Sequence, residues 1–205
     1  KSTKNQIIQK NMKNCIRSSV SLCILLLFLY TNLSNAQGFN SITTPDGVNI
    51  IAVGNSGKLY RSASGGVTYT SSTVSGAPNL YSVTSVGNDV WLTGQNGNVI
   101  KTLKTSSPNN TYNVGSSANL NSVTFLTSNT GYVCGDGGVV YKSVNGGVNW
   151  TSSNSGIASV KLNLISFKDN NNGTIVGNNG TVYVTADGGA SWTAQSSGTS
   201  YNLLK

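Results

Sequence analysis

From residue 39 onward, apolar and polar side chains alternate in short runs, which is the period of a β-strand. The stretch from 121 to 152 shows the pattern, with runs at 121–125, 131–134 and 139–143 and a fourth that begins at Trp150. Glycine and asparagine lie between the runs, as in Gly135-Asp-Gly-Gly138, and both residues tolerate the positive φ of tight hairpins. No window after residue 36 has helical spacing. The pattern therefore predicts an all-β chain.

The strand pattern repeats with a period near 41 residues. Four G-x-x-G turns begin at residues 54, 94, 135 and 177, which are 40, 41 and 42 residues apart. An apolar segment precedes each turn, at 39–42, 80–83, 120–123 and 162–165, and a hydroxyl residue follows each at the same offset. Four short strands in a unit of this length are typical of a β-propeller blade. A β-solenoid is the alternative, but its coils are usually shorter and need fewer hairpins.

We therefore predict a partial β-propeller over 37–205. Its four-stranded antiparallel blades are placed at about 39–78, 79–118, 119–160 and 161–200, and residues 201–205 are placed at the start of the next blade.

A second motif follows the third and fourth G-x-x-G turns. Residues 143–150 and 185–192 both read [ST]-x-[DN]-x-G-x-x-W; the first unit has a degraded copy at 62–69, and the second has lost the motif after Thr102. The acidic or amide side chain accepts N–H groups within the turn, glycine supplies the unusual φ, and the aromatic ring packs over the blade. We predict a structural role for these residues: Ser62, Gly66, Tyr69, Ser143, Asn145, Gly147, Trp150, Thr185, Asp187, Gly189 and Trp192.

The motif resembles the Asp-box, or BNR, repeat. The whole unit, from residue 39 to 205, resembles the photosystem II assembly and stability factor type of BNR-like propeller. That resemblance implies six to eight blades, so we expect this chain to be a fragment of a larger propeller. The alternative is a complete small protein that closes by self-association through its open blades. Plant and cyanobacterial members carry an arginine-rich patch, whereas this sequence has only Arg61 after residue 36, so the resemblance is used for the fold alone.

The first 36 residues have the three parts of a secretory signal peptide. Lys13 and Arg17 precede an apolar run at 20–30, and Ser34-Asn-Ala36 supplies small residues before Gln37. Met12 is well placed to start translation, which leaves residues 1–11 upstream. We predict cleavage after Ala36 and a secreted, periplasmic or cell-surface protein. The apolar run is shorter than the roughly 20 residues of a spanning helix, so no permanent membrane span is expected; the alternative is a buried hydrophobic helix.

The composition excludes several kinds of catalytic and metal site. The sequence has no histidine, and all five acidic residues are aspartates, so a Ser-His-Asp triad, a histidine zinc site and a glutamate general acid are excluded. The net charge is +8, but five of the 13 basic residues precede residue 20 and the others are scattered singly. Nucleic-acid binding needs clustered cations, so it is not expected. Cys134 is predicted to be a small buried hydrophobe. We expect no catalytic residue, no metal and no cofactor.

Three classes of function remain. The first is an exported non-catalytic propeller scaffold that binds a protein or a glycan. The second is a fragment of an Asp-box glycoside hydrolase, sialidase-like or xyloglucanase-like, whose acids would come from Asp46, Asp89, Asp136 or Asp169. The third is a structural spacer module of a cell-surface protein.

Strand alternation predicts the binding face. In an up-and-down blade, the G-x-x-G turn lies at the same end as the crossing to the next blade, and the Asp-box turn lies at the other end. The predicted ligand-binding residues are those of the G-x-x-G turns: Asn55, Ser56, Gln95, Asn96, Asp136, Asn178 and Asn179. Neutral hydrogen-bonding groups with one acid suit a glycan or a peptide backbone. The alternative is that these residues are present for their φ angles alone.

Overall fold

A computed structural model describes residues 38–76, 79–106 and 109–204. The predicted signal peptide, its cleavage site and residues 1–11 lie outside the described residues. The chain divides into two units, Lys1–Gly38 and Phe39–Lys205. The strands of the described residues all belong to the second unit. Within the described residues, no helix has the length and apolar character needed to cross a membrane.

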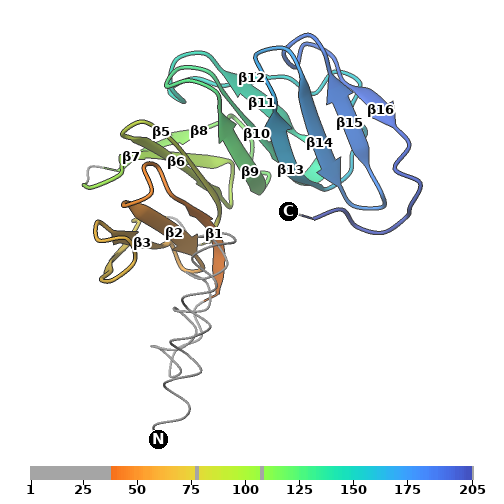
Figure 1. The fold of residues 1–205 in the computed structure, drawn as a ribbon. Helices are drawn as coiled ribbons and strands as arrows, with labels where there is room; N and C mark the ends of the chain where they lie inside the picture. Colours follow the sequence, from red (N-terminus) through yellow and green to blue (C-terminus); the bar gives the residue numbers. More distant parts are fainter. Residues whose placement is uncertain (1–37, 77–78, 107–108, 205) are drawn as a thin grey trace, which may run out of the picture. The chain divides into compact units, whose positions relative to one another are not determined.

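The strands form four antiparallel sheets of four strands each, and each sheet keeps the order of the sequence (Figure 1). The first blade contains β1 (Phe39–Thr43), β2 (Ile50–Gly54), β3 (Lys58–Ser62) and β4 (Thr70–Thr73). The second contains β5 (Leu80–Val86), β6 (Asp89–Gly94), β7 (Asn98–Leu103) and β8 (Asn110–Asn113). The third contains β9 (Leu120–Phe125), β10 (Gly131–Gly135), the 3-10 turn η1 (Asp136–Gly138), β11 (Val140–Ser143) and β12 (Thr151–Ser152). The fourth contains β13 (Leu162–Phe167), β14 (Gly173–Gly177), β15 (Val182–Thr185) and β16 (Thr193–Gln195).

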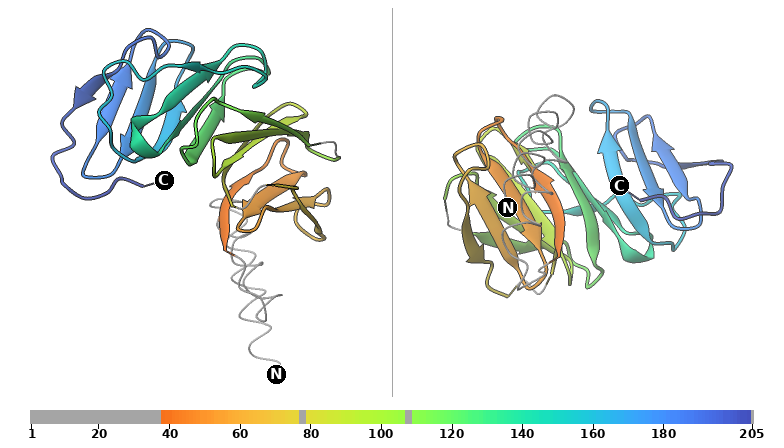
Figure 2. Two further views of the ribbon diagram at one scale, coloured as in Figure 1. Left: turned by 180° about the vertical axis from the view of Figure 1, so that it is seen from behind. Right: turned by 60° about the horizontal axis from the view of Figure 1, so that its bottom comes forward.

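This arrangement confirms the predicted all-β fold of four-stranded antiparallel blades. Sheets that are neighbours in sequence are neighbours in space (Figure 2). A solenoid would share its sheets between successive coils, whereas here every hairpin pairs within its own unit.

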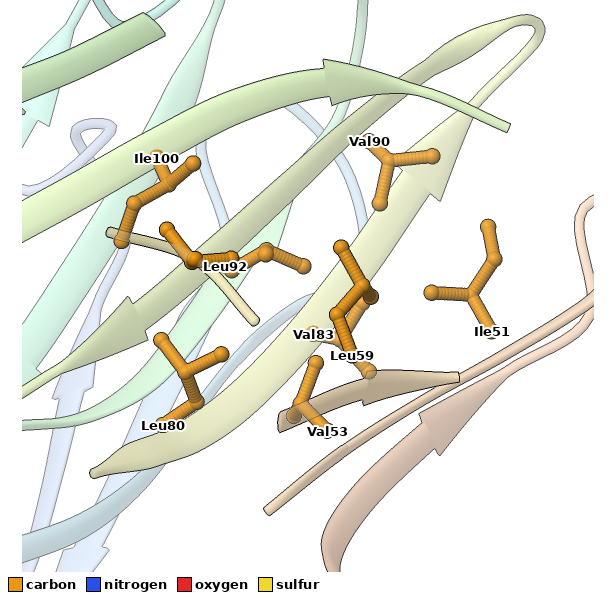
Figure 3. Packing of buried hydrophobic residues seen from close by; sticks show 9 residues of the cluster. Ile51, Val53, Leu59, Leu80, Val83, Val90, Leu92 and Ile100 are labelled. Atoms are coloured by element: carbon orange, nitrogen blue, oxygen red, sulfur yellow. The ribbon is translucent and has the colours of Figure 1, made fainter. Parts of the chain in front are cut away.

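The hydrophobic core lies between successive blades, because alternate residues of each inner strand point to opposite faces of the sheet. Between the first two blades, Ile51, Val53 and Leu59 lie in one cluster with Leu92 and Ile100 (Figure 3). A second cluster joins blades two and three, and a third joins blades three and four. Cys134 is fully buried in the third cluster, as predicted.

Two stacked aromatic pairs connect the later blades. The rings of Trp91 and Phe125 lie 3.7 Å apart at 7°, and those of Tyr132 and Phe167 lie 3.9 Å apart at 18°. The polar atoms of the first rings bind the next blade, since Trp91 Nε1 donates to the Gly146 carbonyl and the Tyr132 hydroxyl donates to the Gly188 carbonyl, each at 2.9 Å. Trp91 and Tyr132 occupy equivalent positions in consecutive units, so the same ring stack and hydrogen bond recur at two junctions between blades.

A serine at the third position of the first strand makes another repeated contact. The hydroxyls of Ser41, Ser82 and Ser122 accept backbone N–H bonds from the first strand of the next blade, at 3.1, 3.3 and 3.3 Å. These bonds satisfy backbone donors that the blade interface buries.

Candidate functional site

The four G-x-x-G turns connect the second and third strands of each blade and lie at the end where the chain enters that blade. Gln95 N donates to Asn79 O, Asp136 N to Asn119 O and Asn178 N to Lys161 O, at 3.2, 2.9 and 2.9 Å. Each acceptor immediately precedes the first strand of the same blade. The turns and the crossings therefore share one end, as strand alternation predicted.

The third residue of each turn has a left-handed backbone. Ser56, Asn96 and Asn179 have φ of 56°, 60° and 57°, and Gly137 has 72° at the same place. Asparagine and glycine tolerate this region better than other residues. Backbone geometry therefore accounts for part of the residue choice.

The second residue of the turn supports the blade interface in three units. The side-chain oxygens of Asn55, Asp136 and Asn178 accept bonds from the amide groups of Asn40, Asn121 and Asn163, at 3.0, 2.8 and 2.9 Å. We call the three donors the asparagine ladder.

Each member of the asparagine ladder also reaches the next blade position. Its Nδ2 donates at 2.8 Å to the backbone oxygen of Leu80, Leu162 or Leu203. The side chains of Asn55, Asp136 and Asn178 are thus engaged in holding blades together.

Four predicted binding residues keep their side chains available. Among the described residues, the side chains of Ser56, Gln95, Asn96 and Asn179 make no hydrogen bond, and side chains of other residues contact only the backbone of Ser56, Asn96 and Asn179. Ser56, Asn96 and Asn179 are exposed, and Gln95 is half-buried. We call these four the rim residues.

All five aspartates have local partners. Asp46 accepts bonds from its own turn and from Lys104, at 2.9 Å, and Asp89 pairs with Lys101 at 3.0 Å. Asp136 accepts the two amides of Asn119 and Asn121. Asp169 and Asp187 accept N–H groups within their own turns.

The surroundings of three aspartates favour the ionised carboxylate. Hydrogen bonds lower the pKa of three aspartates: the backbone N–H of Asn49 acts on Asp46, the amide of Asn172 on Asp169 and the hydroxyl of Ser191 on Asp187. A glycosidase acid needs a raised pKa. Among the described residues, no group of three or more histidine, cysteine or acidic side chains is placed to hold a metal ion.

The side chains of the Asp-box motifs stabilise their own turns through hydrogen bonds to the backbone. Ser143 Oγ accepts the N–H of Gly147 and Asn145 Oδ1 accepts that of Asn149, both at 2.9 Å. Thr185 and Asp187 make the same two contacts in the fourth blade, at 2.9 and 3.0 Å. In the first blade, Ser62 and Ser64 do so with hydroxyls, at 3.0 and 2.9 Å.

The aromatic residues of the three motifs differ in burial. Trp192 is 3% exposed, and its Nε1 donates to Ser153 O of the preceding blade at 2.8 Å. Trp150 is half-buried, and its Nε1 donates to Gly147 O of its own turn at 2.9 Å. Tyr69 is also half-buried.

Asp187→Asn is expected to reduce the loss of folding stability that occurs as the pH falls below about 4. The pKa of Asp187 is lowered in the folded chain, so its contribution to stability is present above about pH 4 and is lost as the pH falls toward the lower folded-state pKa. Asparagine keeps the acceptor, as Asn145 does in the third blade, but does not titrate. Melting temperatures measured from about pH 6 to pH 2 should fall less steeply in the variant. An unchanged slope would contradict this role of Asp187.

The chain is similar to known propellers. Residues 101–199 match the family model described as Photosynthesis system II assembly factor YCF48. The structure of YCF48 from Cyanidioschyzon merolae superposes with a TM-score of 0.64 at 16% identity, covering 80% of this chain and 58% of that one. YCF48 bound to D1 peptide gives a TM-score of 0.55 at 13% identity, covering 84% and 87% of the two chains.

An ancestral GH74 enzyme also matches, with a TM-score of 0.62 at 15% identity, covering 76% of this chain and 23% of that one. No curated protein matches the sequence. The chain spans little more than half of the Cyanidioschyzon protein. At these identities the structures establish the fold, and with the family model they confirm the resemblance to YCF48-like BNR propellers.

Proposed function

We propose that this chain is a propeller scaffold that binds a peptide segment of another protein at its G-x-x-G end. The observation that carries the proposal is the set of rim residues, which offers uncharged donors and acceptors from three blades at one end of the sheets. The side chains of Asn55, Asp136 and Asn178, in the same turns, already bind the asparagine ladder that joins the blades. An extended peptide presents alternating backbone donors and acceptors that match such groups.

Two further observations support a binding role over hydrolysis. Every aspartate that a glycosidase would use is engaged in its own turn, an ion pair or a blade contact. A YCF48 propeller is known bound to a D1 peptide, so this fold accommodates a peptide in at least one similar protein. A glycan remains the competing partner, and the experiment below separates the two.

Replacing Gln95 by Ala and Asn179 by Gly together is expected to weaken peptide binding about tenfold, because each lost hydrogen bond contributes about 0.5–1.5 kcal/mol. Glycine suits position 179, since Gly137 holds the equivalent left-handed place. Peptides would be selected from a randomised display library, a glycan array would be tested in parallel, and dissociation constants would be measured by fluorescence anisotropy.

The matched control is Asn129→Ala, an exposed residue in the turn between β9 and β10, at the other end of the sheets. It should leave the affinity unchanged. Selection of glycans without any peptide would overturn the proposed function. Equal losses in the control and the double variant would overturn the assignment to the rim.

We also propose that the chain is exported, on the basis of the charged segment, apolar run and small residues that precede Gln37. Expression in a bacterium with a secretory pathway should give a product that begins at Gln37. Intact-mass measurement of the exported protein tests this, and an uncleaved cytoplasmic product would contradict it.

A further inference from the structure

A groove of about 420 Å³ lies between the third and fourth blades at the Asp-box end. The third blade contributes the end of β11, its turn, and the strand β12 with the residues that follow. The fourth blade contributes its Asp-box turn. The lining includes Lys142, Asn145, Asn149, Ser152, Asn154 and Gly188.

A lysine, Lys142, lines the groove. Lys142 Nζ donates to Gly188 O at 2.9 Å and lies 5.3 Å from the centre of the Tyr132 ring. The repeat-equivalent Lys101 lies 5.2 Å from the Trp91 ring and also pairs with Asp89 at 3.0 Å. The place of Asp89 is taken by Thr130 in the third blade. Among the described residues, no carboxylate pairs with Lys142.

The neighbouring amide adds a donor. Asn145 Oδ1 already accepts from Ser143 Oγ and Asn149 N, at 3.1 and 2.9 Å. This use of the oxygen leaves the Nδ2 group for a ligand. The carboxylate of Asp187, in the adjacent turn, is held by Ser191 and Thr185. An ammonium and an amide N–H₂ at one groove favour an acceptor with negative charge.

One wall of the groove is a sheet edge. The order of the third sheet is β12-β11-β10-β9, so β12 is an outer strand. Ser153 N donates to Val140 O on β11 at 2.8 Å. Because hydrogen-bonding directions alternate along an antiparallel strand, the N–H and C=O of Ser152 point to the open edge. Such an edge pairs with an extended peptide.

We propose that this groove is a second binding site, which takes an extended peptide along β12 and places a carboxylate of that peptide against Lys142 and Asn145. The ligand carboxylate pairs with Lys142 in the way that Asp89 pairs with Lys101. The described lining contains no aromatic ring on which a sugar would stack, which favours a peptide over an acidic glycan. The inference rests on the proposed peptide-binding function, but it concerns the opposite end of the sheets.

The test uses the full chain and acidic peptides selected from the same display library, each paired with a twin in which Asp or Glu is replaced by its amide. The twin should bind about tenfold more weakly, because a charge-assisted bond is lost. Lys142→Met should give a similar loss. Thr130→Asp should also weaken the acidic peptide about tenfold by giving Lys142 an internal partner, while keeping the lysine and its contact with Gly188. Lys101→Met is the matched control and should leave the affinity unchanged.

Equal affinity of the acidic peptide and its amide twin would overturn the site, as would full binding by Thr130→Asp. Peptides that respond only to the Gln95 and Asn179 substitutions would overturn the groove and leave the rim function standing. Selection of glycans alone would overturn both. Melting temperatures of all variants separate loss of binding from loss of folding.

Discussion

Trp192→Ala is expected to lower the free energy of unfolding by about 3–5 kcal/mol. The indole is 3% exposed, packs edge-on against Phe167 with centroids 5.9 Å apart, and donates its N–H to Ser153 of the third blade. The substitution therefore leaves a cavity and an unpaired carbonyl oxygen between two blades. Chemical denaturation followed by circular dichroism measures the change.

Trp150→Ala is the matched control, because it removes the same ring from the same motif position. Trp150 is half-buried, and its N–H stays within its own turn. We expect a smaller loss of about 1–2 kcal/mol. Equal losses of unfolding free energy in the two variants would show that the contribution of Trp192 does not come from its contact with the third blade.

Gly138→Ala is expected to destabilise the chain by more than about 4 kcal/mol, which is exceptional for one substitution. Gly138 has φ of 77°, and a methyl group there would overlap the carbonyl oxygen of Ala158, in the crossing toward the fourth blade. The backbone of the turn lies against that crossing, so neither partner can move independently. Failure to obtain a cooperatively folded protein would meet the same expectation.

Gly137→Ala separates backbone strain from the overlap. Gly137 precedes Gly138, has φ of 72°, and has open space around the position of a Cβ atom. Its replacement should cost about 1 kcal/mol, from the left-handed backbone alone. Denaturant melts of both variants give the difference. Similar losses in the two proteins would contradict the close approach at Gly138.

The sequence predicted the blade because a blade is built from local patterns. Alternation, glycine turns and the Asp-box recur within each unit of about 41 residues, and each pattern acts on residues that pair as hairpins. The end of the sheets that carries the G-x-x-G turns also followed from strand direction alone.

The contacts between blades could not be read from these local patterns. Phe125 stacks on Trp91, 34 positions earlier, and nothing in either hairpin indicates that the rings meet. The asparagine ladder left a signal, since Asn40, Asn121 and Asn163 share one offset in three units. The repeated asparagine does not by itself indicate that its amide binds both its own turn and the next blade. The ion pair of Lys101 with Asp89, which Lys142 lacks among the described residues, depends on side-chain positions that the local pattern does not specify.

The stacked rings are not distributed evenly along the chain. Ser85 holds the position of Phe125 and Phe167, and its hydroxyl meets that of Thr43 at 3.0 Å, so a pair of hydroxyls stands at this position between blades one and two. An aromatic pair contributes about 0.5–1.5 kcal/mol beyond its buried area. The two stacked pairs therefore add to the coupling from the second blade to the fourth, and we expect these three blades to open together rather than one at a time.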